Sequence, residues 1–287
     1  MKNKLISIIL PNYNHARYLP ERLDSIFNQT YQNFEVIIMD DASTDKSVSI
    51  LDAYRNHPKV SHFIVNDKNS GSPFKQWETG LQVAKGEYIW IAESDDTCEY
   101  TFLEQQLKAI KEKKATIAVA QTKKINNQGI YGTVNHPIFQ DKNELILNND
   151  YFLYCPILNV SATVFSARLS SQRSTYSDFQ LIGDRVFYFE VFQGEKIIEN
   201  TKTVSYFRKE KDSVSTLSSK GLSYLKLYYK EHQRFAETAF NDNKIDKKLY
   251  NTYITRFFNR VNNRLSRKQK CSLMYIMLRF QFYSDLK

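Results

Sequence analysis

The sequence lacks the glycine-rich signatures of common nucleotide-binding proteins. It contains neither G-x-x-x-x-G-K-[ST] nor G-x-G-x-x-G, which excludes a P-loop and an ordinary dinucleotide-binding site. With 8 glycines and 6 prolines in 287 residues, a repeat or linker-rich architecture is not indicated. The 3 cysteines form no C-x-x-C pair, so we expect neither a disulfide framework nor a zinc knuckle, and a reducing, cytoplasmic setting fits best.

Long apolar runs are also missing. No stretch reaches the ~18 apolar residues needed to span a bilayer. The lysines and apolar residues at the N-terminus resemble a signal peptide, but the run ends at Pro11 without a cleavage site, so we expect a buried strand there.

The net charge of +9 is concentrated near the C-terminus. Residues 216–287 contain 15 Lys and Arg against 5 Asp and Glu, whereas residues 1–110 contain 11 and 15. An enzyme acting on nucleic acid would carry basic residues around its catalytic groove as well, so we expect no nucleic-acid partner.

The first half alternates between β-rich apolar runs and helical patterns, with Pro20 able to open the first helix and Thr44 able to cap the second. This alternation predicts an α/β fold with a doubly wound, mainly parallel sheet and helices on both faces. The predicted strands are 5–10, 34–39, 60–65, 87–92 and 116–120, and the predicted helices are 20–30, 45–56, 74–84 and 101–113.

The second half is less regular. We predict strands over 159–165, 196–200 and 203–209, a helix over 183–194, and C-terminal helices over 221–240, 246–265 and 268–283.

Polar segments follow four of the predicted strands. They are PNYNH (11–15), DDASTD (40–45), NDKNSGS (66–72) and ESDD (93–96). Ligands of doubly wound sheets bind beyond the carboxyl ends of the strands, so we expect these segments to converge on one edge.

The ESDD segment supplies Glu93, Asp95 and Asp96. Carboxylates at a strand end can hold a hard divalent cation, which can bridge a diphosphate and neutralise the charge of the leaving group. A D-x-D motif by itself is more often a solvated acidic turn than a metal site. Here the motif lies at the expected edge of the sheet, and this position favours a metal site. Asp41 could accept a hydrogen bond from a nucleobase, or it could be a helix cap.

Two further side chains have open interpretations. Tyr13 could stack on a nucleobase or simply pack in its loop. Lys75, in SPFKQW, could meet a phosphate or be a solvated helix lysine.

ISIILPNYNHARYLPERLDSIFNQTYQNFEVIIMDDASTDKS and KGEYIWIAESDD resemble the opening strands and the metal motif of family 2 glycosyltransferases, which have the GT-A fold. The match is nearly unbroken over residues 5–104. Beyond residue 120, NVSATVF, IGDRVFYFEV and YFRKEKDSVS resemble pieces of bacterial members.

The resemblance implies a role for each matching position. Pro11, Tyr13 and Asp41 would hold the nucleoside, Asp95 would be the main ligand of Mn²⁺ or Mg²⁺, and Glu93 and Asp96 would hold the donor sugar or the metal. Asp184 matches the family's catalytic carboxylate, the general base that deprotonates the acceptor hydroxyl. From the sequence alone, the catalytic role of Asp184 is weakly supported, because acidic residues are common at helix N-termini. The helix dipole there would also lower the pKa of Asp184, which argues against a strong base.

Three positions depart from the family pattern. Glu93 stands where Asp is commoner, and Tyr100 replaces a proline. Glu210 replaces a histidine thought to approach the metal or diphosphate. A glutamate could still bind the metal, but it offers no cation to a phosphate.

The resemblance implies an inverting glycosyltransferase that transfers a sugar from a UDP-sugar to a saccharide or lipid-linked saccharide in bacterial surface polysaccharide synthesis. The Q-x-x-R-W motif of processive synthases is absent, which favours single-sugar transfer. Residues 1–120 would form the nucleotide-sugar-binding half, 121–215 the acceptor-binding half, and 216–287 a basic helical extension. A nucleotidyltransferase acting on sugar phosphates would carry a glycine-rich signature near its first strand, and PNYNHARYL is not one. The alternative function that remains is a non-catalytic nucleotide-sugar-binding or scaffold protein with the same fold.

The basic C-terminal extension has two interpretations. Its helices could pack on the catalytic domain or form a homodimer. Alternatively, Arg256, Arg260 and Arg264, with the apolar segment 272–283, could rest on the anionic inner face of the cytoplasmic membrane.

Overall fold

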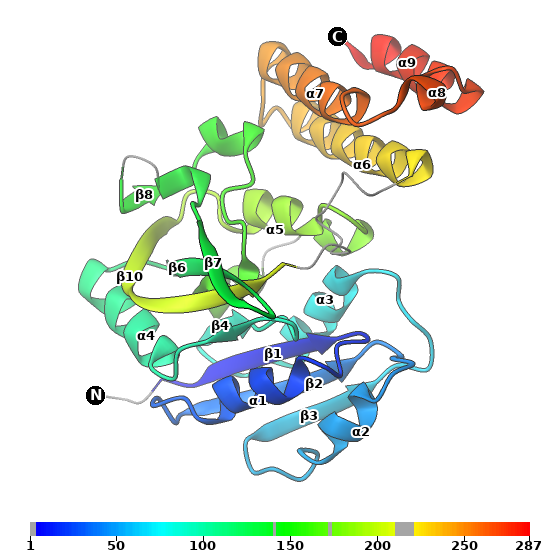
Figure 1. Cartoon of the computed structure of the whole chain (residues 1–287). Coiled ribbons are helices and arrows are strands. Elements are labelled where there is room, and N and C mark those ends of the chain that lie inside the picture. Colours follow the sequence, from blue (N-terminus) through cyan, green and yellow to red (C-terminus); the bar gives the residue numbers. More distant parts are fainter. Residues whose placement is uncertain (1–3, 140–141, 172–173, 210–220) are drawn as a thin grey trace. The chain divides into compact units, whose positions relative to one another are not determined.

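The computed structural model describes residues 4–139, 142–171, 174–209 and 221–287 (Figure 1). The chain forms two compact units, Met1–Lys209 and Glu210–Lys287. The boundary that we expected at residue 215 lies outside the described residues. The division of the first unit into a donor half and an acceptor half stays a prediction.

The first unit is built on a ten-stranded sheet with the path β3-β2-β1-β4-β9-β6-β10-β5, to which β7 and β8 add through β6 and β10. The pairs among β1 to β4 and the pair β6–β10 are parallel, whereas β5, β7, β8 and β9 pair antiparallel. The α/β class is therefore confirmed, with a more mixed sheet than expected. The strands are β1 (Ile6–Asn12), β2 (Phe34–Asp40), β3 (Val60–Val65), β4 (Tyr88–Ile91), β5 (Thr97–Cys98), β6 (Ile117–Asn126), β7 (Gly129–Val134), β8 (Glu144–Ile146), β9 (Thr163–Ser166) and β10 (Lys196–Arg208).

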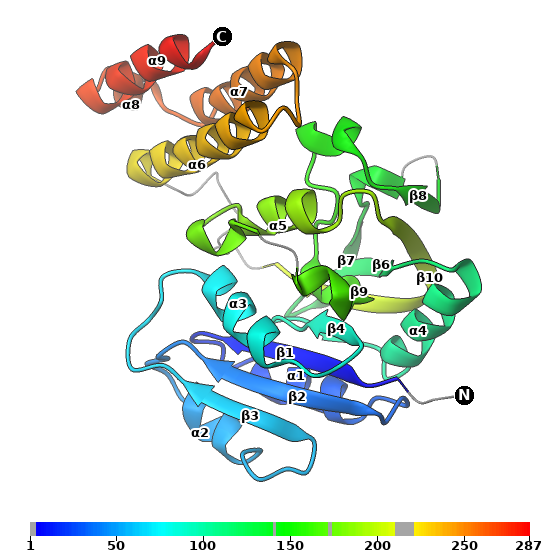
Figure 2. The same cartoon turned by 180° about the vertical axis from the view of Figure 1, so that it is seen from behind.

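Helices cover both faces of this sheet (Figures 1 and 2). On one face, the Trp90 ring of β4 lies 4.7 Å from the guanidinium of Arg22 and 4.8 Å from the Phe102 ring. On the other face, a Cβ added at Gly80 would lie 2.5 Å from the Ile9 side chain, so only glycine allows this close packing. The helices are α1 (Leu19–Phe27), α2 (Ser47–Asp52), α3 (Pro73–Val83), α4 (Phe102–Lys113) and α5 (Gly183–Val191).

The start of the second helix differs from the prediction. α2 begins at Ser47, and Thr44 does not cap it. Instead, the Thr44 amide donates to Asn14 Oδ1 at 2.7 Å. The predicted N-cap was wrong because Thr44 contacts the loop after β1 instead. The local sequence does not reveal this tertiary contact.

Irregular segments explain two further differences. The predicted strand 159–165 begins as a 3₁₀ turn and continues as β9, and the two strands predicted over 196–209 are one strand, β10, with an irregular register between Asn200 and Val204. The 3₁₀ turns are η1 (Pro137–Phe139), η2 (Asn149–Leu153), η3 (Val160–Ala162), η4 (Ala167–Ser171) and η5 (Tyr176–Asp178).

The second unit is helical, with α6 (Leu222–Asn241), α7 (Lys247–Asn262), α8 (Arg267–Lys270) and α9 (Leu273–Asp285). The Phe258 ring of α7 stacks on Phe282 of α9 at 4.1 Å and contacts Tyr229 of α6 at 5.8 Å. The apolar face of α7 is thus buried within this unit. Among the described residues, none of the helices is long and apolar enough to cross a bilayer.

Candidate active site

The polar segments after β1, β2 and β4 meet at one edge of the sheet. Asn12 donates from Nδ2 to Asp40 Oδ2 at 2.7 Å, which joins the ends of β1 and β2. His15 Nδ1 lies 2.8 Å from Ser94 Oγ, which joins the first of these segments to the acidic segment after β4. The predicted convergence of these segments is therefore present.

The carboxylate of Asp41 holds the loop between β3 and α3. Its Oδ1 accepts hydrogen bonds from Asn66 Nδ2 at 2.7 Å, from the Ser70 amide at 2.9 Å and from Gln76 Nε2 at 2.9 Å. Its Oδ2 accepts from Ser70 Oγ at 2.8 Å. Because Asp41 is only 4% exposed, a nucleobase N–H would have to bind at Oδ2 or displace one of these loop contacts.

The other proposed donor-binding residues lie at the same edge. The exposed Lys75 donates from Nζ to the carbonyl of Ser70 at 3.2 Å, so it lies over the loop that Asp41 organises. Tyr13 is exposed one residue beyond β1, where its ring is free to stack. Pro11 is buried within β1, so its contribution to a ligand would be the shape of the backbone.

Glu93 is fixed from two sides. Its Oε1 accepts a hydrogen bond from Trp77 Nε1 at 2.7 Å, and its amide donates to Ser161 Oγ at 3.1 Å. Burial, followed by the negative charge of Asp95, raises the pKa of Glu93 to about 8. A cation bound beside Glu93 would oppose this shift and favour the ionised carboxylate.

Arg208 holds the other two acidic residues of the motif. Its amide donates to Asp96 Oδ1 at 2.9 Å, and its Nε donates to the Asp95 carbonyl at 2.9 Å. Burial and the charge of Asp95 raise the pKa of Asp96 above its ordinary range.

A buried positive charge lies behind these carboxylates. The three guanidinium nitrogens of Arg22 have no hydrogen-bond partner among the described residues. Burial lowers the pKa of Arg22, and the nearby charges of Asp96, Asp95 and Glu93 oppose that shift. Arg22 therefore offsets part of the mutual repulsion of the acidic motif.

The donor set fits a divalent cation shared with a substrate. Arg208 binds the backbone oxygen of Asp95, which leaves the Asp95 carboxylate without a hydrogen-bond partner among the described residues. Within those residues, no three His, Cys, Asp or Glu side chains are grouped to hold a metal ion. Mg²⁺ commonly uses one or two carboxylates together with substrate phosphates, which suits a site of this kind. Glu210, the other proposed ligand, lies outside the described residues.

Asp184 lies in the first turn of α5. Its Oδ1 accepts a hydrogen bond from the Arg185 amide at 2.7 Å, and its Oδ2 lies 3.9 Å from Cys155 Sγ. Burial raises the pKa of Asp184. The expectation of a lowered pKa at the helix N-terminus was therefore wrong, because the loss of hydration outweighs the amide hydrogen bond.

Close packing fixes the position of Asp184. A Cβ added at Gly183 would lie 2.3 Å from the Phe74 ring of α3, so glycine lets α5 begin against that helix. Burial, the charge of Asp184 and, more weakly, the charge of Glu93 raise the pKa of Tyr188. Phe187 of the same helix packs its ring 5.9 Å from the ring of Trp77, whose Nε1 donates to Glu93, so one side chain connects α5 with the acidic motif.

Sequence reasoning gave no role to Arg22, Trp77 or Arg208. Trp77 had a local signal, because it lies two residues from Lys75 on the predicted helix. Arg208 had none, since it lies 112 positions from Asp96 along the chain.

The structure combines a mixed α/β sheet, an acidic motif at its polar edge and a buried carboxylate at a helix start, as expected of a glycosyltransferase with the GT-A fold. The chain belongs to glycosyl transferase family 2, whose family model matches residues 7–169. It is 39% identical over 120 residues to "Glycosyltransferase GlyG" of Streptococcus pneumoniae, covering 41% of this chain and 38% of that protein. It is 34% identical over 128 residues to the poly(ribitol-phosphate) beta-N-acetylglucosaminyltransferase TarS of Staphylococcus aureus, covering 43% and 22%. The matched part is therefore well under half the length of either relative.

Solved structures share the fold. The crystal structure of S. aureus TarS 1-349 in complex with UDP-GlcNAc has a TM-score of 0.70 and 21% identity, covering 99% of this chain and 82% of that one. The mannosyltransferase PcManGT of Pyrobaculum calidifontis, in complex with GDP-Man and Mn²⁺, has a TM-score of 0.58 and 16% identity, covering 97% and 79%.

Proposed function

We propose that the protein is an inverting glycosyltransferase that moves a single sugar from a UDP-sugar to a saccharide or lipid-linked saccharide of the bacterial surface. The carrying observation is that Trp77 of α3 joins the two parts of the site. Its Nε1 donates to Glu93, and its ring packs 5.9 Å from the ring of Phe187 in α5, the helix whose first turn holds Asp184. The UDP-GlcNAc complex of TarS supports UDP as the nucleotide. The activity of TarS on poly(ribitol phosphate) supports a surface polymer as the acceptor.

The donor would bind along the edge formed by the ends of β1 and β2. Asp41 would accept a base N–H at Oδ2, Tyr13 would stack on the base, and Pro11 would shape the floor. Lys75, already held over the Ser70 loop, would turn toward a phosphate. Each of these contacts uses a group that the fold presents at the same edge.

Asp95 would hold Mn²⁺ or Mg²⁺ between the protein and the diphosphate, with Glu93 and Asp96 assisting and Glu210 as a further candidate ligand. When bound, the cation neutralises the charge of the departing diphosphate. Arg208 fixes the backbone of Asp95 and the carboxylate of Asp96, so the motif is held in place before the donor arrives.

Asp184 would accept the proton of the acceptor hydroxyl. The hydroxyl oxygen forms a bond to the anomeric carbon as the bond from that carbon to the diphosphate oxygen breaks, which inverts the configuration. The diphosphate leaves with the bonding electrons. The raised pKa of Asp184 makes it a stronger base than an ordinary aspartate.

A two-stage experiment tests this function. Nucleotide-sugars are first screened for thermal stabilisation of the wild-type protein, and the best donor is then followed for hydrolysis with and without Mn²⁺. A transferase releases the nucleotide, and faster with the metal. Binding without any turnover would support the non-catalytic scaffold instead.

We also propose that the second unit contacts an anionic membrane from the cytoplasmic side. On α9, Tyr275, Leu278 and Phe282 are buried, whereas Leu273 and Phe280 are each 73% exposed. The other exposed apolar residues of this face are Met274, Ile276, Met277 and Tyr283. The neighbouring α8 is composed largely of basic residues, and apolar anchoring beside cationic residues is typical of interfacial helices. A second copy of the chain could cover the same face instead.

A further inference from the structure

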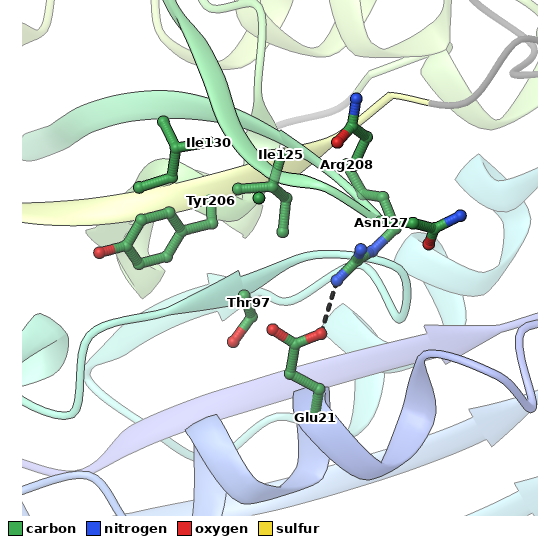
Figure 3. Close-up of a pocket in the computed structure, with 9 residues that line it drawn as sticks. Glu21, Thr97, Ile125, Asn127, Ile130, Tyr206 and Arg208 are labelled. Atoms are coloured by element: carbon green, nitrogen blue, oxygen red, sulfur yellow. Dashed lines mark hydrogen bonds and ion pairs between the residues drawn. The ribbon is translucent and has the colours of Figure 1, made fainter.

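A pocket of about 530 Å³ lies on the first unit, apart from every residue assigned above to the nucleotide or the base (Figure 3). It is bordered by α1, β5, the β6–β7 hairpin and the end of β10. None of Tyr13, Asp41, Lys75 or Asp184 lines it. The pocket is therefore separate from the proposed positions of the nucleoside and the base.

The lining has one apolar side and one polar side. Figure 3 shows Ile125, Ile130 and the ring of Tyr206 together on one wall, and Arg208 with Glu21 across from them. Arg208 Nη2 donates to Glu21 Oε2 at 2.6 Å, with Arg208 itself largely buried and Glu21 half-exposed.

This combination suits a neutral sugar. A pyranose has an apolar C–H face, which can lie on the isoleucines and the tyrosine ring, and a rim of hydroxyls that both donate and accept hydrogen bonds. Glu21 can accept from such hydroxyls, and the guanidinium of Arg208 can donate to them. A phosphate would meet the Glu21 carboxylate, which makes an anionic ligand unfavourable here.

Two residues that line the pocket connect it to the acidic motif. Thr97 lines it and follows Asp96 in the chain, and Arg208 reaches from the pocket wall to Asp96 Oδ1 and to the Asp95 carbonyl. A sugar bound in the pocket therefore lies beside the residues proposed to hold the donor.

We propose that this pocket is an acceptor subsite that binds a neutral sugar unit of the saccharide chain receiving the transferred sugar. The inference rests on the proposed transferase function, because a pure nucleotide-binding protein would need no second sugar site. It identifies the acceptor as one with at least one uncharged pyranose unit.

The test compares Ile130→Arg with Tyr131→Arg. Both side chains are exposed on the β6–β7 hairpin, at 58% and 50%, but only Ile130 lines the pocket. Each variant and the wild type are applied to an array of neutral oligosaccharides from bacterial surface polymers. We expect Ile130→Arg to weaken glycan binding roughly tenfold or more, the size of effect that steric misfit in a pocket produces. Tyr131→Arg should bind like the wild type.

Hydrolysis of the best donor nucleotide-sugar is measured on the same three proteins and separates this inference from the proposed function. Normal hydrolysis by all three, with glycan binding unchanged in Ile130→Arg or undetectable in the wild type, overturns the subsite alone. Loss of glycan binding in Ile130→Arg without hydrolysis by the wild type would show that the pocket binds glycan, but it would overturn the transferase and, with it, the role of the pocket as an acceptor subsite. An equal loss in Tyr131→Arg overturns the subsite, because the effect would then belong to the hairpin as a whole.

Discussion

Trp77 Nε1 donates a 2.7 Å hydrogen bond to Glu93 Oε1, and the preceding residue of α3, Gln76, donates a 2.9 Å bond to Asp41 Oδ1. Two consecutive side chains of one helix therefore hold the proposed nucleoside-binding carboxylate and the first residue of the acidic motif. The helix keeps both in fixed relation before any ligand binds, which reduces the ordering needed on binding.

A double-mutant cycle measures the first of these contacts. Trp77→Phe and Glu93→Ala should each lower the free energy of unfolding, and together they should lower it by about 1 kcal/mol less than the sum, because the hydrogen bond is lost only once. Urea unfolding of the four proteins gives the coupling energy. Strict additivity would mean that the bond contributes nothing to stability.

Asp184→Asn should retain the affinity for the donor and lose transfer by about 100-fold or more, the minimum contribution of a general base. In the wild type, the acidic limb of the rate–pH profile should lie above the ordinary aspartate pKa of 3.8, because burial raises the pKa of Asp184. Steady-state kinetics over pH and calorimetric binding of the donor provide both readouts.

Glu104→Gln is the matched control for that variant. Glu104 also lies in the first turn of a helix, α4, where its exposed side chain accepts a hydrogen bond from Thr30 Oγ1 at 2.8 Å. It should leave the rate and its pH profile unchanged. Equal losses of donor affinity and rate in Asp184→Asn would assign Asp184 a structural role instead.

His136 makes the stability of the first unit depend on pH. Burial lowers its pKa from 6.5 to about 4, and its Nδ1 accepts a hydrogen bond from the Leu158 amide at 3.1 Å, which requires the neutral ring. The unfolded chain binds a proton that the folded protein excludes. Stability contributed by the neutral ring is therefore complete above pH 6.5 and is lost as pH falls toward 4, by about 3 kcal/mol in all.

His136→Gln should flatten this dependence. Chemical denaturation at pH 7, 6, 5 and 4 gives the difference between the two proteins, which should shrink as the pH falls. A constant difference between wild type and variant across that range would show that His136 does not govern the slope.

Phe280→Glu should weaken binding to vesicles containing anionic lipid, because it places a charge on the exposed apolar face of α9. Ser284→Glu adds the same charge to an exposed polar position of that helix, and it should have the smaller effect. Vesicle co-sedimentation at low and high salt measures both variants. The membrane proposal would be contradicted if vesicle binding did not change with lipid charge or salt and Phe280→Glu instead abolished dimerisation. The exposed face of α9 would then be the contact with a second copy of the chain.

The sequence predicted which segments meet at the edge of the sheet, but it did not predict the long-range side-chain contacts that hold the acidic motif there. Parallel strands place their carboxyl ends together, so the meeting of Asn12 with Asp40 followed from the strand pattern alone. The Arg208 contacts to the acidic motif did not, because strand β10 returns to the sheet after a long irregular segment. The pKa of Asp184 was misjudged for the same reason, since its burial comes from tertiary packing that a helix-start motif does not reveal.

We propose that Asp95 binds the cation that makes donor turnover possible. The most direct test is the Mn²⁺ dependence of donor hydrolysis by Asp95→Asn, measured beside its melting temperature. Because the Asp95 side chain has no hydrogen-bond partner among the described residues, the variant should melt like the wild type. This role of Asp95 predicts a loss of turnover of about 100-fold or more and no response to Mn²⁺. Near-wild-type turnover with an unchanged Mn²⁺ response would contradict it.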